Sequence, residues 1–389
     1  MQNITNKYFL SLSRSAIRGE AVQNAPQGVD FDKLLWLAYH HGMVEILSYV
    51  IPKIEPKIEG EIAKTFERLR RTGIAKEINQ EIELGALCDA FSKNGIDYML
   101  LKGSVLKKHY PTPDMRSMCD IDMLIKKSQV KQADKIMTEL GYIDKLTSDH
   151  DISYKKPPYI NIELHYNMTQ YDFGKRAFEY YKNIWSMAKQ IGDTHAHELS
   201  PEDFYVHHIE HMSKHYALGG CGVRPFCDIF VFLNAHPSID FDYISKALDE
   251  ICLKDFEAHV RALALKWFGD GEGDEVSEAM EGYILTGGAY GTVERGDISL
   301  IVRKGTKKKK VSKLKLLLYK AFLPYRHMKV VYPSLKKAPY LLPFYWIYRI
   351  ICVLLFRRKK IKSNLKVNEK EAQINALSTH FTTVGLTEF

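Results

Sequence analysis

The stretch MRSMCDIDMLI, residues 115–125, places two aspartates, Asp120 and Asp122, one residue apart among apolar neighbours. On a β-strand, residues i and i+2 point to the same face, so the two carboxylates would project together. Two adjacent carboxylates repel each other unless a cation lies between them, and Mg²⁺ prefers carboxylates and substrate phosphates as ligands. The pair therefore predicts a divalent metal site, and the alternative is a solvated acidic pair at a strand end.

Other residues suited to phosphate or metal chemistry flank this pair. Lys102, Gly103 and Ser104 stand at a predicted strand-to-helix turn. Glycine lets a backbone approach a phosphate, serine can donate a hydroxyl, and a helix start favours an anion. Glu163 lies midway along the predicted strand 159–168 and would complete a three-carboxylate cluster if that strand neighbours the first. Taken singly, the turn could be an ordinary helix N-terminus and Glu163 a solvated residue, but their order favours a site.

The spacing of apolar residues predicts the elements that position these side chains. Residues 60–93 are predicted to form a long helix or a helical pair that ends at Asn94-Gly95, a C-cap signal. Short strands alternate with helices beyond it, so the predicted fold class is α+β: a small mixed sheet with flanking helices, plus a mostly helical second domain. The other predicted helices are 31–50, 102–110 and 127–142, the last capped by Ser128 and stopped at Gly141; the predicted strands are 96–101, 119–125 and 159–168.

The segments LLKGSVLKKHYPTPDMRSMCDIDMLI and IELHYN resemble an uncharacterised nucleotidyltransferase family that is often found beside bacterial polysaccharide-synthesis genes. That family belongs to the DNA polymerase β-like nucleotidyltransferase superfamily. The superfamily pattern is a Gly-Ser turn, a DxD pair and a third acidic residue, matched in order by Gly103, Ser104, Asp120, Asp122 and Glu163. The resemblance extends from the LLWLAYHHGM helix to the LLPFYW region. This chain has a longer segment, with two prolines, between the turn and the DxD pair than the commonest superfamily spacing.

The resemblance implies transfer of a nucleoside monophosphate from an NTP to an acceptor, with release of pyrophosphate. It implies that Asp120, Asp122 and Glu163 hold two Mg²⁺ ions, with Mn²⁺ as the alternative ion. One ion would hold the triphosphate, and the other would lower the pKa of an acceptor hydroxyl. Glu163 would share the second ion and could act as the base.

The resemblance also implies roles for the turn and for nearby cations. Gly103 and Ser104 would hold the β- and γ-phosphates. Lys102 and Arg116 would neutralise the triphosphate or the leaving pyrophosphate. The alternative for each of these two basic residues is an ordinary surface charge.

A segment rich in histidine follows, DFYVHHIEHMSKHYALGGCGVRPFCDIF. Three of its histidines, spaced by four, share one helix face: His207, His211 and His215. The preferred interpretation is a polar face turned toward the cleft, with Lys214 and Arg224 contacting the nucleotide or the acceptor. The alternatives are structural capping and core hydrogen bonding, or a zinc site completed by cysteines of the same segment.

The formal net charge of +8 hides a strong asymmetry. Residues 298–368 contain 20 Lys and Arg and no Asp or Glu, so the remainder has 35 basic and 47 acidic residues, a net charge of 35 − 47 = −12. This basic and apolar region suits an anionic membrane surface, a nucleic acid such as tRNA, or packing against the acidic body of the protein itself. Its longest apolar run, 341–356, is shorter than the ~20 residues that cross a bilayer, so the membrane interpretation is a peripheral contact.

Six cysteines without a CxxC pair predict reduced structural thiols, and MQNITNKYFL lacks the layout of a secretory signal. The predicted location is therefore cytoplasmic, with the membrane contact at the inner membrane surface. The predicted domains are an N-terminal helical region (1–94), a nucleotidyltransferase α/β core (95–175), a helical domain that completes the cleft (176–285), a basic and partly apolar region (286–368) and a flexible tail (369–389).

The predicted function is Mg²⁺-dependent nucleotidyl transfer to an unidentified sugar, protein or tRNA, with polysaccharide biosynthesis as the implied context. One alternative is a toxin-like nucleotidyltransferase that modifies tRNA or protein, for which the basic region is the main support. Another is a non-catalytic scaffold or nucleotide-binding protein. The intact acidic triad argues against the scaffold, because neutral substitution would usually have removed one carboxylate.

Overall fold

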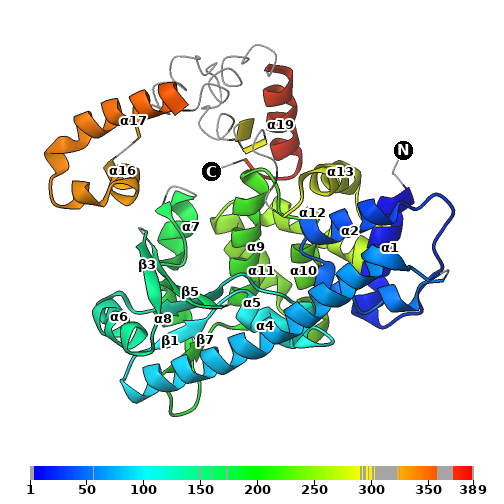
Figure 1. The fold of residues 1–389 in the computed structure, drawn as a ribbon, viewed down its shortest axis with the longest axis horizontal. Coiled ribbons are helices and arrows are strands. Elements are labelled where there is room, and N and C mark those ends of the chain that lie inside the picture. The colour runs from blue at the N-terminus through cyan, green and yellow to red at the C-terminus, as the bar shows by residue number, and fades with distance from the viewer. Residues whose placement is uncertain are drawn as a thin grey trace.

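A sheet with flanking helices and a larger helical body make up the fold (Figure 1). The arrangement is α+β, as the sequence predicts. The basic run 307–310 and residues 357–370 lie outside the described part of the chain. The computed structural model describes residues 4–55, 57–148, 150–158, 160–171, 174–289, 291, 295–296, 298–299, 302, 322–323, 325–356 and 371–387.

Three N-terminal helices begin the described chain. Asp30 caps the second, because its side chain accepts a hydrogen bond from the backbone amide of Lys33 at 2.9 Å. The predicted helix 31–50 is broken at Gly42, whose φ of +66° lies in the left-handed region that glycine adopts without strain. The helices are α1 (Ile4–Arg18), α2 (Phe31–His40) and α3 (Val44–Leu47).

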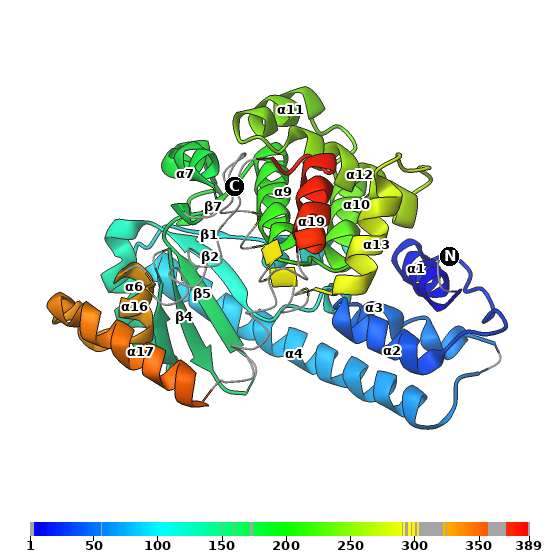
Figure 2. The ribbon, with the colours of Figure 1, turned by 90° about the horizontal axis from the view of Figure 1, so that it is seen from above.

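One long helix, α4 (Gly60–Lys93), belongs to both parts of the fold. Its 34 residues rise about 1.5 Å each, which makes it roughly 51 Å long. Phe66 near its start packs in the core of the helical body, and Phe91 near its end packs in the core beside the sheet. Figures 1 and 2 both show it running from the N-terminal helices to the sheet. The predicted stop is confirmed, since Asn94 caps the helix and Gly95 follows with a φ of +68°.

Among the described residues, the sheet has seven strands in the order β3-β4-β5-β2-β1-β7-β6. β2 pairs with β5 and β1 with β7 in parallel, and the other four pairs of neighbours are antiparallel. Glu163 was expected to join the two aspartates only if its strand neighbours theirs. β2 and β5 are indeed neighbours. The strands are β1 (Tyr98–Leu100), β2 (Ile121–Ile125), β3 (Ile143–Thr147), β4 (Asp151–Lys156), β5 (Ile160–His165), β6 (Lys189–Gln190) and β7 (Ala196–Glu198).

The two hairpins at the sheet edges, β3–β4 and β6–β7, were not predicted. Charged residues interrupt the apolar pattern in β4 and in β3, which is an edge strand, where such residues are common. The predicted helical domain, 176–285, also contains the strands β6 and β7, which are only two and three residues long. The predicted Ser128 cap is also absent, because a 3₁₀ turn, Lys127–Gln129, precedes α6 (Val130–Glu139).

The helical body shares one hydrophobic core with the N-terminal helices. Its last helix, α19, contributes Phe381 to that core, and the hydroxyl of Tyr216 lies 2.7 Å from His380 Nε2. Residues 371–387 are therefore packed on the body, whereas the sequence suggested a flexible tail. The helices are α7 (Lys175–Tyr180), α8 (Ile184–Met187), α9 (Pro201–Ala217), α10 (Arg224–Ala235), α11 (Phe241–Glu250), α12 (Lys254–Phe268), α13 (Ser277–Gly287) and α19 (Glu371–Thr383).

Two further helices, α16 (Tyr325–Val331) and α17 (Leu342–Phe356), come before α19 in the chain. Figure 1 shows this pair apart from the sheet and from the helical body. No helix among the described residues is long and apolar enough to cross a membrane.

Candidate active site

The parallel pairing of β2 and β5 brings two of the predicted carboxylates together. Asp122 stands opposite Glu163 in the register, so both side chains leave the same face of the sheet. Asp120 comes directly before the first residue of β2. All three acidic residues line one cavity of about 330 Å³, which the helices α9 and α10 close from the other side. The sequence prediction that these carboxylates converge is supported by this shared cavity.

Asp122 is the most strongly held of the three carboxylates. Lys102 Nζ donates a hydrogen bond to Asp122 Oδ1 at 2.6 Å, and His165 Nε2 lies 2.7 Å from the same oxygen. Burial opposes the charge of Asp122, but Lys102 and His165 outweigh it and hold the pKa of this carboxyl well below its ordinary value. Lys102 itself has a φ of +48°, a costly conformation for a residue with a Cβ, at the turn between β1 and α5 (Gly103–Leu106).

The other two carboxylates are poorly compensated. Burial and the negative charge of Asp122 raise the pKa of Asp120 above its ordinary value. Burial and the charges of Asp120 and Asp122 raise the pKa of Glu163 to about 7. The positive charge of Lys102 compensates Asp122 more than it compensates Asp120 and Glu163. A bound cation would therefore stabilise the ionised forms of these two carboxylates.

His165 is a functional candidate that the sequence reasoning did not single out. It lies two residues after Glu163 on β5, so period-2 spacing puts both side chains on one face, and this signal was available. Asp122, Glu163 and His165 offer ligand atoms within 4.8 Å of one another, whereas Asp120 is not part of that group. His165 Nδ1 is buried and has no hydrogen-bond partner among the described residues. His165 also belongs to a second group of potential metal ligands, together with His150 and Asp151.

The predicted Gly-Ser turn contributes only its glycine to the cavity wall. Gly103 lines the cavity, and a Cβ at this position would meet Met118 Sδ at 2.7 Å, so a larger residue would require the Met118 side chain to move. Ser104 is buried, its hydroxyl lies 3.9 Å from Met118 Sδ, and it is not a lining residue. α5 is a single four-residue turn, so the helix dipole that the sequence argument invoked is small.

The two predicted arginines both line the cavity but differ in their partners. Arg116 Nε and Nη2 donate to the two oxygens of Asp228 on α10 at 2.6 and 2.9 Å, and Tyr110 adds a third hydrogen bond to Asp228. Arg224 Nη1 donates to the backbone carbonyl of Ser117 at 3.0 Å, while its Nε is buried without a hydrogen-bond partner among the described residues. Burial and the nearby charge of Arg116 lower the pKa of Arg224. Arg224, rather than Arg116, is therefore the arginine with charge left for an anion.

The predicted histidine face on α9 is present and turns partly toward the cavity. His211 and His215 line the cavity, and their Nε2 atoms lie 3.2 Å apart, while His207 is buried behind them. Lys214 is not a lining residue; its Nζ donates to Thr169 Oγ1 at 2.8 Å and lies 3.3 Å from Glu210. The zinc alternative finds no support, since no group of three potential ligands among the described residues includes these histidines.

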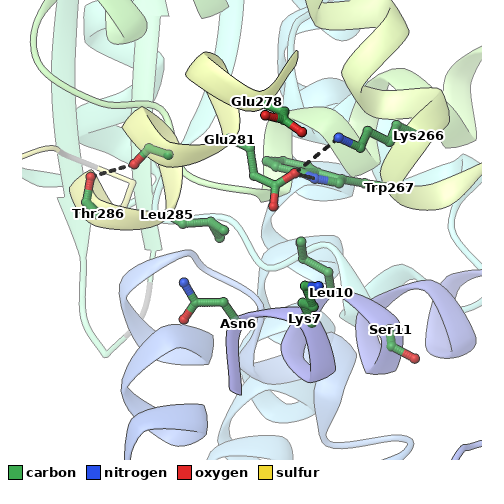
Figure 3. A pocket seen from close by; sticks show the side chains of 11 residues that line it. Asn6, Lys7, Leu10, Ser11, Lys266, Trp267, Glu278, Glu281, Leu285 and Thr286 are labelled. Carbon is green, nitrogen blue, oxygen red and sulfur yellow. Dashed lines mark hydrogen bonds and ion pairs between the residues drawn. The ribbon is translucent and has the colours of Figure 1, made fainter. Parts of the chain in front are cut away.

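A second cavity, of about 800 Å³, lies between α1 and the α12–α13 pair (Figure 3). Two of its charged groups are paired within its own wall: Lys266 Nζ lies 3.7 Å from Glu281, and Trp267 Nε1 donates to the same carboxylate at 3.2 Å. It shares no lining residue with the acidic cavity, so we assign the metal and phosphate chemistry to the latter.

An α+β fold in which carboxylates and basic side chains line one cavity is suited to a metal-dependent transferase of phosphate groups. The sequence profile of a family described as uncharacterised nucleotidyltransferase matches residues 27–269, which is more than half of the chain. The protein belongs to this family. No curated protein and no solved structure shows a significant match to the chain. The matched range includes β2, β5, α9 and α10, which form the wall of the acidic cavity.

Proposed function

We propose that the protein transfers a nucleoside monophosphate from an NTP to an acceptor in the acidic cavity, with release of pyrophosphate. The observation that carries this proposal is the pairing of Asp122 with Glu163 across two parallel strands, beside Asp120 and the cations Lys102 and Arg224. Membership of a nucleotidyltransferase family supports the general reaction. The toxin-like and scaffold alternatives gain no specific support from the geometry.

The side chains present fit a hard divalent cation. The donor set is carboxylate-rich, and Lys102 compensates Glu163 only in part, since the pKa of this carboxyl stays raised to about 7. We propose that Asp120, Asp122 and Glu163 hold two Mg²⁺ ions, or Mn²⁺ in their place, with His165 beside Asp122. Bound Mg²⁺ would supply charge that stabilises the triphosphate and would acidify the acceptor hydroxyl.

The remaining steps fall to the side chains of the chain itself. Glu163, which lines the cavity opposite Asp122 in the β2–β5 register, would accept the proton of the acceptor hydroxyl. Arg224 and Lys102 would bind the phosphate oxygens, and Gly103 would let the backbone come close to them. Arg116, whose charge is matched by Asp228, would hold the cavity wall rather than the substrate.

The proposed acceptor is a sugar, a protein or a tRNA, and a sugar would agree with a role in polysaccharide biosynthesis. The proposed location is the cytoplasm, where NTPs are supplied. Peripheral membrane contact is a separate property that concerns residues 322–356.

NTPs labelled at the α-phosphate or at the γ-phosphate test the proposal directly. With Mg²⁺ and cell lysate, label from the α-phosphate of one NTP should pass to an acceptor, and label from the γ-phosphate should appear in pyrophosphate. EDTA should stop both, because the carboxylates then lack their ions. Transfer of the γ-label to the acceptor would contradict the proposal, and NTP binding without transfer of either label would favour the scaffold.

Replacing Glu163 with glutamine should stabilise the metal-free protein at pH 8 by about 1–3 kcal/mol in unfolding free energy. The pKa of Glu163 rises from its ordinary value of 4.5 to about 7 in the folded protein. The native state therefore keeps a proton that the unfolded state has lost, and wild-type stability falls as pH rises through this window. The gain should consequently be smaller at pH 5. Urea unfolding at the two pH values measures it.

The same variant should gain less thermal stability from Mg²⁺ than the wild type does, because it lacks one charged ligand. Glu198→Gln, at an exposed glutamate on β7, is the control and should alter neither quantity. Equal Mg²⁺ responses in wild type and Glu163→Gln would remove Glu163 from the proposed ligand set.

A further inference from the structure

A stripe of large apolar side chains is exposed along α17 and the turn before it. Their spacing of four, three, one and three residues puts them on one helix face. Each is about half exposed or more, although the described part of the chain buries most residues of these types. They are Tyr340 (77% exposed), Phe344 (67%), Ile347 (56%), Tyr348 (57%) and Ile351 (48%). We refer to these five residues as the α17 stripe.

The other side of α17 is fixed by packing, so the orientation of the stripe is defined. Trp346 Nε1 donates to the backbone carbonyl of Leu323 at 2.8 Å, and its ring lies 5.4 Å from the ring of Phe322. The ring of Tyr345 lies 4.7 Å from that of Tyr332, in the turn after α16. The helix thus packs one face on α16 and its neighbours and presents the other to the outside, and Tyr348 lies at the border, with its ring 6.2 Å from that of Tyr332.

The charge of the surrounding chain restricts what can cover such a face. Residues 298–368, which include α16 and α17, have 20 basic residues and no acidic one. Four consecutive basic residues, 357–360, follow directly after the last residue of α17 in the sequence. Packing on the acidic body would have buried the stripe, but the stripe is exposed. Apolar and aromatic side chains combined with a purely basic segment complement an anionic bilayer surface.

The length of α17 favours a helix that lies along such a surface. Its 15 residues would extend about 22 Å, whereas the hydrocarbon core of a bilayer is about 30 Å thick. Tyrosine and phenylalanine suit the headgroup boundary, where one end of the ring meets water and the other meets acyl chains.

We propose that the α17 stripe docks on the surface of an anionic lipid bilayer. The apolar side chains enter the boundary between headgroups and acyl chains, and the positive charge that the sequence gives to 298–368 complements the charge of the lipids. This property is independent of nucleotidyl transfer, because the stripe shares no residue with the acidic cavity. It would hold the enzyme at the membrane surface.

Co-sedimentation of the full chain with lipid vesicles tests the proposal. The wild type should bind vesicles of phosphatidylcholine mixed with phosphatidylglycerol, bind phosphatidylcholine alone much more weakly, and be released from the mixed vesicles by high salt. Equal binding to both kinds of vesicle, or to neither, would overturn the proposal.

A matched pair of double variants shows whether the α17 stripe is responsible for binding to the anionic vesicles. Ile347→Ser with Ile351→Ser should lower the partition coefficient on the anionic vesicles by about tenfold or more. The control is Ile78→Ser with Ile82→Ser on α4, which changes two isoleucines of similar exposure (55% and 65%) at the same spacing of four. The control should bind vesicles as the wild type does, and both variants should keep the wild-type melting temperature.

Three results would overturn the proposal. One is equal loss of vesicle binding in the two double variants. Another is full vesicle binding by the α17 variant. The third is a wild-type dimer in size-exclusion chromatography that becomes a monomer only in the α17 variant, without vesicle binding, which would show that a second copy of the chain covers the stripe.

Discussion

Replacing Asp122 with asparagine is expected to lower nucleotidyl transfer by about 10³-fold or more, which corresponds to about 4 kcal/mol of transition-state stabilisation. Asp122 stands opposite Glu163 in the β2–β5 register and holds both Lys102 and His165 through one oxygen. Asparagine keeps the shape but removes the negative charge that a metal ligand needs. Transfer of the α-phosphate label, measured at saturating Mg²⁺ and NTP, gives the loss directly.

The same substitution should also cost about 1–3 kcal/mol of unfolding free energy, because a carboxyl with a depressed pKa stabilises the fold while it is ionised. Asp203→Asn separates the two effects. Asp203 is buried on α9, accepts hydrogen bonds from Ser200 and Tyr243, and lies outside the cavity. This control should lose some stability and keep its transfer activity. Wild-type transfer by Asp122→Asn would contradict the proposed function.

Replacing Arg116 with methionine should destabilise the fold by about 3–5 kcal/mol, the largest stability effect expected here. Arg116 and Asp228 form a bidentate ion pair, and both side chains are buried. Burial opposes both charges, but each raises the ionisation of the other: Asp228 raises the pKa of Arg116, and Arg116 lowers that of Asp228. Methionine fills much of the same volume but leaves the buried Asp228 charge without its ion-pair partner, while the Tyr110 hydroxyl still donates to it. Urea unfolding measures the loss.

Arg224→Met is the matched comparison. Arg224 lines the same cavity, but it donates to a backbone carbonyl and forms no ion pair with a carboxylate among the described residues. Its loss should change stability by less than about 1 kcal/mol and should instead raise the KM for the NTP. If Arg224→Met were more destabilising than Arg116→Met, the proposed roles, structural for Arg116 and substrate-binding for Arg224, would be wrong.

Local sequence patterns were sufficient for the carboxylates and for the strands that carry them. Asp120, Asp122 and Glu163 are close in the chain to strongly apolar runs, and period-2 spacing determines the face on which they lie. The same period-2 spacing places His165, two residues after Glu163, on that face as well. The α+β class followed from the alternation of short strands with helices, and the end of α4 followed from Asn94-Gly95.

Contacts between distant parts of the chain were not accessible in this way. Arg116 and Asp228 are separated by 112 residues, so no local pattern assigns Arg116 a buried partner. Ser104 was predicted to face a phosphate, but Met118 packs against Gly103 and the serine hydroxyl. The hairpin β6–β7 is too short to leave a periodic pattern. In each case the deciding interaction is tertiary, and no local preference encodes it.

The length of α4 has a consequence for how substrates reach the cavity. The helix is anchored in the core of the helical body at one end and in the core beside the sheet at the other. An uninterrupted helix of this kind gives the sheet and the helical body no hinge between them, and the ion pair between Arg116 and Asp228 on α10 is a second connection, in the wall of the cavity. Selection of nucleotide and acceptor would then depend on how they fit a preformed cavity opening. Products would leave through the same opening, without a domain-closure motion.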